Sequence, residues 1–255
     1  MDVSAILKSF VSDTQAAFGN NLTGIYLHGS LARGCFHENK SDIDLLVVVE
    51  QPLSTDIKRG YVKKMLSLNR HAPKKGIEMS VVLKKDMTPF CHPAPFEMHF
   101  SNAHLESYMS DPDDAIMRLT GTDRDLAAHV TIINHYGQTL FGEDKEKVFS
   151  KVKHEDYLDA LLYDLENARE DISEDPMYVA LSLCRVLAYV KEQKVLSKKD
   201  GAVWALKNVK SDMHPVIKEA LNSYETDSDM LITPEDARRF ADEMLSDIRT
   251  CMLRK

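Results

Sequence analysis

Hydrophobic positions in the first hundred residues switch between a helical and a strand spacing. Apolar side chains recur at steps of three and four over residues 3–17 and again over 57–68, which predicts two amphipathic helices. Short runs rich in β-branched residues over 24–28, 43–49 and 77–83 predict strands, the second apolar enough to be buried on both faces. Strands separated by helices indicate an α/β unit.

From about residue 112 the pattern becomes helical nearly throughout. One predicted helix spans 123–140, and an apolar stripe over 157–165 predicts another. Three later helices are predicted from the residues that would cap their first turns. These residues are Asp175, which precedes Pro176, and Ser197 and Thr233, which are each followed three residues later by an aspartate. Residues 141–156 are charge-dense and weakly periodic, which predicts a domain boundary near 150.

We therefore expect an α+β chain of two domains, an α/β domain over residues 1–150 and an all-helical bundle over residues 151–255. A cleft between two such domains is the usual place for a small ligand. The chain has 255 residues, long enough for cores that need no disulfide or metal.

The net charge of −8, from 32 basic and 40 acidic residues, disfavours a broad nucleic-acid binder, which needs many Lys and Arg facing phosphates. Residues 155–175 alone carry nine acids and one Arg, so the rest of the chain sums to zero. This acidic segment has two interpretations. It either binds a cationic partner or is the solvated face of a helix.

Signals for membrane insertion or export are missing from the pattern. The longest apolar run is Leu45–Val49, whereas a spanning helix needs about 18 residues. No positively charged segment precedes an apolar stretch at the N-terminus. The four cysteines are scattered without a CxxC pair, which fits neither a disulfide framework nor a zinc cluster. We expect a cytoplasmic protein with no membrane or nucleic-acid partner, and a monomer.

The segment LHGSLARGCFHENKSDIDLLVVV, residues 27–49, carries the candidate chemistry. Gly29 and Ser30 follow the first strand and should open a helix, whose free N–H groups suit a phosphate. Asp42 and Asp44 lie two residues apart at the start of an apolar strand, so their side chains share one face. Glu78 stands alone in the next apolar strand. Carboxylates together with substrate phosphates are typical ligands of Mg²⁺.

Each of these features also has a structural interpretation when taken alone. The Gly-Ser pair could be an ordinary turn, the two aspartates could solvate the end of a strand, and Glu78 could face solvent at an edge. Their combination, in this order and on these elements, favours the catalytic interpretation.

A Gly-Ser pair followed by a DxD strand resembles the nucleotidyltransferase superfamily, which has a DNA polymerase β-like palm. Residues 27–49, 77–100 and 171–205 are further similar to the bacterial aminoglycoside adenylyltransferases that act on streptomycin and spectinomycin. The resemblance implies ATP as co-substrate, Mg²⁺ as cofactor and a cationic aminoglycoside or aminocyclitol as acceptor.

The resemblance also implies roles for individual residues. Asp42 and Asp44 would bind Mg²⁺, and Glu78 would be the catalytic base and would contact the acceptor. Gly29, Ser30 and Ser41 would contact the triphosphate, as would two cationic residues of the helical domain, Arg185 and Lys198. The acceptor would be bound by Asp171, Asp175 and Tyr178.

The chain departs from the family pattern on the acceptor side. Ser101–His104 stands where the family carries a tryptophan, Pro93-Ala94-Pro95 interrupts a proline pair, and Tyr178 replaces a histidine. These changes leave the nucleotide half intact, and losing an aromatic platform could favour the smaller spectinomycin. The alternative functions are a nucleotidyltransferase with a protein or tRNA acceptor and a catalytically silent nucleotide-binding module. The intact set of Asp42, Asp44 and Glu78 argues against the silent module.

Overall fold

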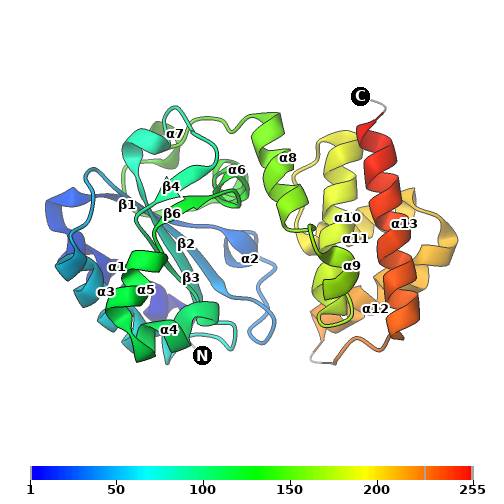
Figure 1. The fold of residues 1–255 in the computed structure, drawn as a ribbon, viewed down its shortest axis with the longest axis horizontal. Coiled ribbons are helices and arrows are strands. Elements are labelled where there is room, and N and C mark those ends of the chain that lie inside the picture. Colours follow the sequence, from blue (N-terminus) through cyan, green and yellow to red (C-terminus); the bar gives the residue numbers. More distant parts are fainter. Residues whose placement is uncertain (1, 227, 254–255) are drawn as a thin grey trace. The chain divides into compact units, whose positions relative to one another are not determined.

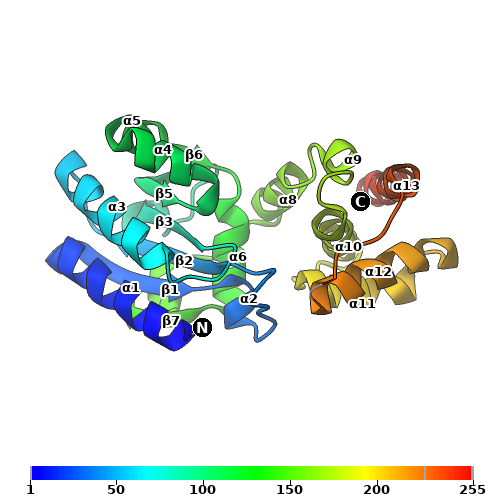
Figure 2. The same ribbon diagram turned by 90° about the horizontal axis from the view of Figure 1, so that it is seen from below.

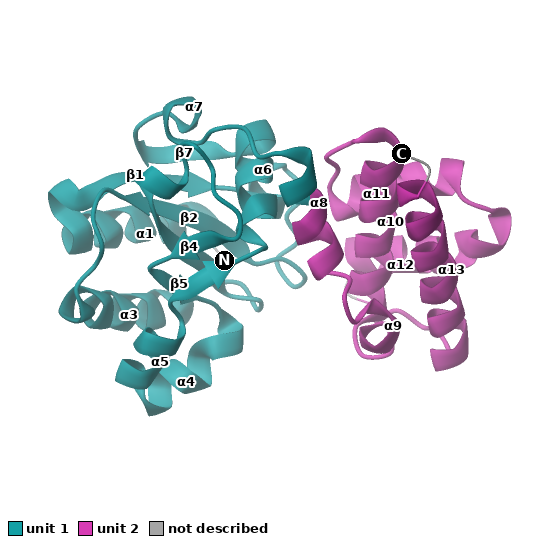
Figure 3. Cartoon of the chain, turned by 45° about the horizontal axis from the view of Figure 1, so that its top comes forward, with its two compact units in different colours: residues 1–157 teal, residues 158–255 magenta. Residues whose placement is uncertain are grey.

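The computed structural model describes residues 2–226 and 228–253, and the chain divides into two compact units. Unit 1 comprises residues 1–157 and unit 2 residues 158–255 (Figure 3). Helix α8 (His154–Tyr163) spans this division. Among the described residues, no helix combines the length and apolarity that crossing a membrane requires.

Unit 1 is built on a five-stranded mixed sheet (Figure 1), whose strand order β5-β3-β2-β1-β7 can be followed in Figure 2. The strands are β1 (Leu22–Leu27), β2 (Ile43–Val49), β3 (Ile77–Leu83), β5 (Met98–Phe100) and β7 (Gln138–Gly142). Only β2 and β3 run parallel, and helix α3 connects them. The three strands predicted from the sequence are confirmed, and the residue bounds of β2 and β3 match the apolar runs.

One face of this sheet forms the hydrophobic core of unit 1. Alternate residues of the strands, among them Leu45, Val47, Met79 and Val81, pack in one buried cluster, to which two long helices contribute many residues. These helices, α1 (Val3–Phe18) and α3 (Thr55–Asn69), lie side by side on this face (Figure 2). Both are the predicted amphipathic helices, and each is capped by its preceding polar residue.

The opposite face of the sheet is covered by α6 (Leu126–Tyr136) (Figure 2). Because side chains alternate along a strand, Asp44, Glu78 and Ser80 belong to this face. Shorter elements complete unit 1; they are α2 (Gly29–Ala32), α4 (Leu105–Ser110), α5 (Pro112–Arg118), α7 (Lys145–Val148) and the two-stranded pair of β4 (Ala94–Phe96) and β6 (Gly121–Asp123).

The predicted helix over 123–140 is wrong at both ends. Residues 121–123 form β6, and Gln138–Gly142 forms β7, which pairs with β1 at the edge of the sheet. At Gly137 the backbone turns extended, and a side chain there would lie 2.7 Å from Cα of Ile133. An edge strand that exposes Gln138 and Thr139 has no clear apolar alternation, so only its pairing partner identifies it.

Unit 2 is all-helical, as predicted. It contains α9 (Ala168–Asp171), α10 (Pro176–Glu192), α11 (Lys198–Asn208), α12 (His214–Glu225) and α13 (Pro234–Met252). Helix α10 is central and packs against each of the other four. The predicted caps are confirmed, since Asp175, Ser197 and Thr233 each accept a hydrogen bond from the backbone N–H three residues later.

Candidate active site

Three carboxylates meet at the amino-terminal ends of β2 and β3. Asp42 directly precedes β2, and Asp44 and Glu78 are register partners in the parallel β2–β3 pair. One oxygen of each residue lies within 4.8 Å of the others, the grouping that a bound cation requires. The structure thus brings together the three acids that the sequence singled out, although Glu78 lies 34 residues after Asp44 and 36 after Asp42.

Gly29 makes room for this cluster. Its φ is +64°, a left-handed conformation that favours glycine, and a Cβ atom there would lie 1.7 Å from Oδ2 of Asp44. The backbone N–H of the preceding residue, His28, donates to the carbonyl of Asp44 at 3.0 Å. The glycine is therefore required for Asp44 to lie beside the turn after β1.

The two predicted serines border the same cluster in different ways. Ser30 lies in the single turn of α2, and its buried hydroxyl has no hydrogen-bond partner in the described part of the protein. A buried polar atom without a partner is costly, which points to a ligand atom at this position. Ser41 is buried, and its Oγ accepts from the backbone N–H of His37 at 3.1 Å, which closes the loop that leads into Asp42.

A histidine of α6 that the sequence analysis did not identify faces the carboxylates. Nε2 of His129 lies 3.0 Å from Oδ2 of Asp125 and 4.0 Å from Oε1 of Glu78. Burial alone would lower the pKa of His129, but Asp125 and then Glu78 and Asp44 raise it to about 10. His129 therefore carries a positive charge at neutral pH. The sequence feature that could have identified His129 is its spacing from Asp125, which lies about one helical turn earlier.

Burial raises the pKa of Glu78 to about 7, with further raising contributions from the neighbouring carboxylates of Asp42 and Asp125. The charge of His129 opposes this rise. A buried carboxyl with a pKa close to neutrality can accept and release a proton near physiological pH. The site therefore has two parts with different chemistry, a pair of aspartates suited to a cation and a glutamate suited to proton transfer.

The predicted cationic residues of unit 2 belong to one group of contacting side chains. Asp164, which follows α8, accepts from the Tyr178 phenol at 2.8 Å and from the Arg185 guanidinium at 3.1 Å. Nζ of Lys198 lies 3.6 Å from the centre of the Tyr178 ring. Gly201 lets α11 approach α10 at this point, since a Cβ there would lie 2.7 Å from Cα of Arg185. Sequence reasoning missed Asp164, because it is one of nine acids in a charged segment.

The two predicted acceptor-binding acids flank the start of α10. Asp171 is exposed and ends α9, while the carboxylate of Asp175 caps α10 through the N–H of Tyr178 at 3.1 Å. Capping uses one lone pair of the carboxylate and leaves further acceptor capacity.

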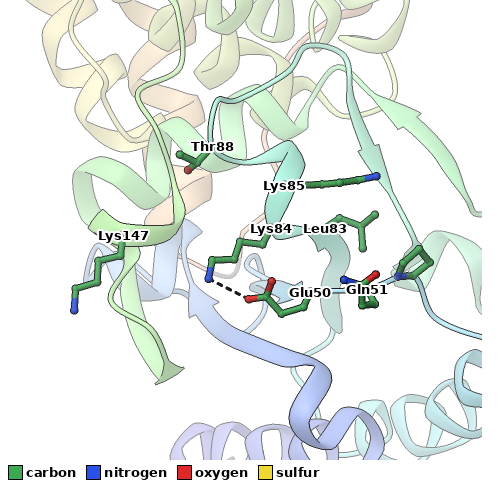
Figure 4. Close-up of a pocket in the computed structure, with 8 residues that line it drawn as sticks. Glu50, Gln51, Leu83, Lys84, Lys85, Thr88 and Lys147 are labelled. Atoms are coloured by element: carbon green, nitrogen blue, oxygen red, sulfur yellow. Dashed lines mark hydrogen bonds and ion pairs between the residues drawn. The ribbon is translucent and has the colours of Figure 1, made fainter.

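A cavity at the other end of the sheet contains none of the predicted residues. It has a volume of about 420 Å³ and lies beyond the carboxyl ends of β2 and β3, bordered by Glu50, Lys84, Lys85, Thr88 and Lys147 (Figure 4). The carboxylate cluster is at the amino ends of the same strands. This cavity is therefore separate from the candidate active site.

Two segments of the chain match known protein families. Residues 6–90, which contain the carboxylate cluster, match the family described as nucleotidyltransferase domain. Together with the fold of unit 1, this match makes the protein a nucleotidyltransferase. Residues 147–247 match the family described as aminoglycoside adenylyltransferase, C-terminal domain.

Curated relatives extend this result over most of the chain. An aminoglycoside (3'') (9) adenylyltransferase of Shigella flexneri is 27% identical over 92% of this chain and 90% of the relative. A spectinomycin 9-adenylyltransferase of Staphylococcus aureus is 25% identical over 74% of this chain and 72% of the relative. Over most of its length, the chain is thus similar to the aminoglycoside adenylyltransferases.

A solved structure confirms the fold. The spectinomycin adenyltransferase of Enterococcus faecalis, crystallised with ATP and spectinomycin, superposes with a TM-score of 0.84 and 20% identity, covering 97% of this chain and 100% of that chain. The predicted architecture, a nucleotidyltransferase domain followed by a helical bundle, is confirmed by this likeness together with the two family matches.

Proposed function

We propose that the protein transfers AMP from ATP to a hydroxyl of spectinomycin or streptomycin and thereby inactivates the antibiotic. The observation that carries this proposal is the cluster of Asp42, Asp44 and Glu78 in a chain of this family. Relatives named for transfer to both drugs support the choice of acceptor.

The donor set of the cluster fits Mg²⁺. Its atoms are carboxylate oxygens, the hard ligands that Mg²⁺ prefers, and one or two carboxylates with substrate phosphates are its usual protein coordination. We assign Asp42 and Asp44 as its ligands. When bound, Mg²⁺ would offset the negative charge of the triphosphate.

Glu78 is the residue that we propose as catalytic base. Its pKa near 7 allows the carboxylate to take the proton of the acceptor hydroxyl at neutral pH. The acceptor oxygen then forms a bond to the α-phosphorus of ATP, and the bond to pyrophosphate breaks. The products are the adenylylated acceptor and pyrophosphate, and the proton remains on Glu78 until solvent removes it.

Several groups near the carboxylate cluster of unit 1 would contact the triphosphate. The orphaned hydroxyl of Ser30, the turn at Gly29 and the loop closed by Ser41 lie around the carboxylates in unit 1. We propose that Arg185 and Lys198 supply positive charge to the phosphates, as the family resemblance implies. Fixed cations of this kind stabilise the charge that develops on the leaving pyrophosphate.

The acceptor would be held through its positive charge. Asp171 is the last residue of α9, and Asp175 caps the start of α10. The backbone N–H of Tyr178 donates to the carboxylate of Asp175. Charge-assisted hydrogen bonds from ammonium groups to carboxylates are short and strong, which suits an aminocyclitol. Residues 101–104 lack the family's tryptophan, so we expect spectinomycin to be the better acceptor.

The direct test is release of pyrophosphate from ATP and Mg²⁺ with a panel of acceptors, combined with mass spectrometry of the acceptor. We expect release that depends on spectinomycin or streptomycin, with a mass gain of one AMP on the drug. Release that depends only on a protein or tRNA would replace this function by the alternative acceptor. No release with any acceptor, from a folded protein that binds ATP, would contradict adenylyl transfer altogether.

A further inference from the structure

One carboxylate in unit 2 holds two of the residues proposed to bind ligands. Oδ1 of Asp164 accepts from the phenol of Tyr178 at 2.8 Å, and Oδ2 accepts from a terminal nitrogen of Arg185 at 3.1 Å. Tyr178 and Arg185 are seven residues apart on α10, so they occupy the same face of the helix about two turns apart. Asp164 therefore fixes two distant points of this face with a single side chain.

Both members of the Asp164–Arg185 ion pair are largely buried. The side chain of Asp164 is 21% exposed and that of Arg185 is 16% exposed. A guanidinium and a carboxylate so far removed from water require each other, because a lone buried charge is costly. Moving either side chain away would leave the other charge largely buried and unpaired, which favours the arrangement seen in the structure.

The group extends to Lys198 through the aromatic ring. The ammonium of Lys198 lies 3.6 Å from the centre of the Tyr178 ring, a cation–π distance. Ser197 caps the helix immediately before this lysine. A connected group thus runs from Lys198 through Tyr178 and Asp164 to Arg185. Three of its members are proposed to bind ATP or the acceptor, and Asp164 is the member that joins them.

We propose that Asp164 is a positioning residue that couples the nucleotide-binding and acceptor-binding side chains of unit 2. The inference rests on the proposed function of Arg185 and Tyr178. Asp164 needs no contact with either ligand, because its effect passes through the phenol and the guanidinium. An acceptor that fixes Tyr178 would also fix Asp164 and thereby Arg185, so that each ligand favours the orientation that the other requires.

The test compares Asp164→Asn, Tyr178→Phe and the double variant by steady-state kinetics. Asp164→Asn keeps the shape but loses the charge, and we expect the KM values for ATP and for the acceptor each to rise about tenfold. Tyr178→Phe should raise mainly the KM for the acceptor. In the double variant the acceptor KM should be no worse than in Asp164→Asn alone, because both substitutions weaken the same Tyr178–Asp164 interaction. Losses that multiply would overturn the coupling.

Two further variants separate positioning from a merely structural role. Asp164→Glu keeps the charge and two acceptor oxygens, and it should recover much of the ATP affinity. Glu225→Gln is the matched control, since it removes an exposed ion pair of 2.5 Å to Lys199 on the same helix as Lys198. A structural role would lower the Tm and the active fraction but leave KM unchanged. An unchanged ATP KM in a folded Asp164→Asn protein would overturn the inference.

Calorimetric titration with ATP and Mg²⁺ distinguishes failure of this inference from failure of the proposed function. This titration needs no acceptor, so it tests whether Asp164 positions Arg185 for ATP binding even if neither drug is modified. We expect about a tenfold weaker Kd for Asp164→Asn and no change for Glu225→Gln. An active wild type whose Asp164→Asn variant binds ATP normally contradicts the inference alone. A wild type inactive on both drugs contradicts the proposed function. If Asp164→Asn does not fold, the Kd for ATP and the KM values of Asp164→Glu and Tyr178→Phe are compared with those of wild type instead.

Discussion

The two ends of the β2–β3 pair carry acidic residues with opposite surroundings. At the carboxyl ends, Lys84 lies 3.0 Å from Glu50 and 2.6 Å from Glu143, and its hydrogen bond lowers the pKa of Glu50. At the amino ends, the carboxylates of Asp42, Asp44 and Glu78 lie close to one another, and the pKa of Glu78 rises although the charge of His129 opposes the rise. Carboxylates paired with a lysine contribute to structure, whereas a cluster of carboxylates that includes one with a raised pKa is a candidate functional site.

The largest expected effect is the loss of activity on removing one carboxylate of the amino-terminal cluster. Asp42→Asn should lower the kcat for AMP transfer by at least about a hundredfold, because a proposed ligand of Mg²⁺ is lost. Glu50→Gln, at the other end of β2, should change kcat less than about twofold, because it weakens only the exposed ion pair with Lys84 and the hydrogen bond from Thr23, both away from the carboxylate cluster. Pyrophosphate release measures both. Equal losses in the two variants would contradict the functional distinction between the ends.

The fit of Gly29 against Asp44 gives a second, smaller effect. Gly29→Ala should lower activity by about tenfold or more and destabilise the fold by about 1–2 kcal/mol, because the methyl group displaces the carboxylate and φ is positive. Gly34→Ala is the matched control, with φ of +71° and no atom within 4 Å of the added Cβ. Thermal melts and kinetics of both variants isolate the contribution of Asp44. Similar activity in the two variants would show that backbone strain alone is responsible.

Glu78→Gln should abolish turnover and yet stabilise the protein at pH 8 without Mg²⁺. The pKa of Glu78 is about 7 in the folded state against an ordinary value of 4.5, so its ionisation disfavours the fold. The stability that the neutral carboxyl contributes is complete below pH 4.5 and is lost as the pH rises towards 7. Glutamine stays neutral, so its advantage should grow over this range to about 1–3 kcal/mol.

Denaturant unfolding at several pH values measures this effect. Glu50→Gln should show the opposite sign at neutral pH, because the pKa of Glu50 is lowered and its ionised form is stabilised by Lys84. A Glu78→Gln protein that is less stable than wild type at pH 8 would contradict the assignment of Glu78 as a buried carboxyl penalised on ionisation.

The smallest expected effect is the response of Tm to Mg²⁺ alone. A ligand that binds only the folded state stabilises by mass action, so millimolar Mg²⁺ should raise the Tm of wild type by a few degrees. Glu50→Gln should respond like wild type, and Asp42→Asn should not respond. A Tm rise that persists in Asp42→Asn would place the bound cation elsewhere.

Much of the fold was predictable because its signals are local. The bounds of β2 and β3 follow from apolar runs, and the starts of α10, α11 and α13 follow from capping residues whose hydrogen bonds span three residues. Strand β7 was missed, because an exposed edge strand takes its identity from pairing with β1, more than 100 residues earlier.

The candidate site divides in the same way. Asp42 and Asp44 were predictable as a pair because alternation along one strand puts them on one face, and the parallel register brings Glu78 beside Asp44. His129, Asp125 and Asp164 carry no motif, since nothing in their own segments shows that α6 covers the polar face of the sheet or that Asp164 meets α10. The sequence by itself determined the elements, their caps and the acids suited to a cation, because these depend on neighbours along the chain. Only the tertiary structure decided which charges oppose or join them, because those contacts depend on how distant segments pack.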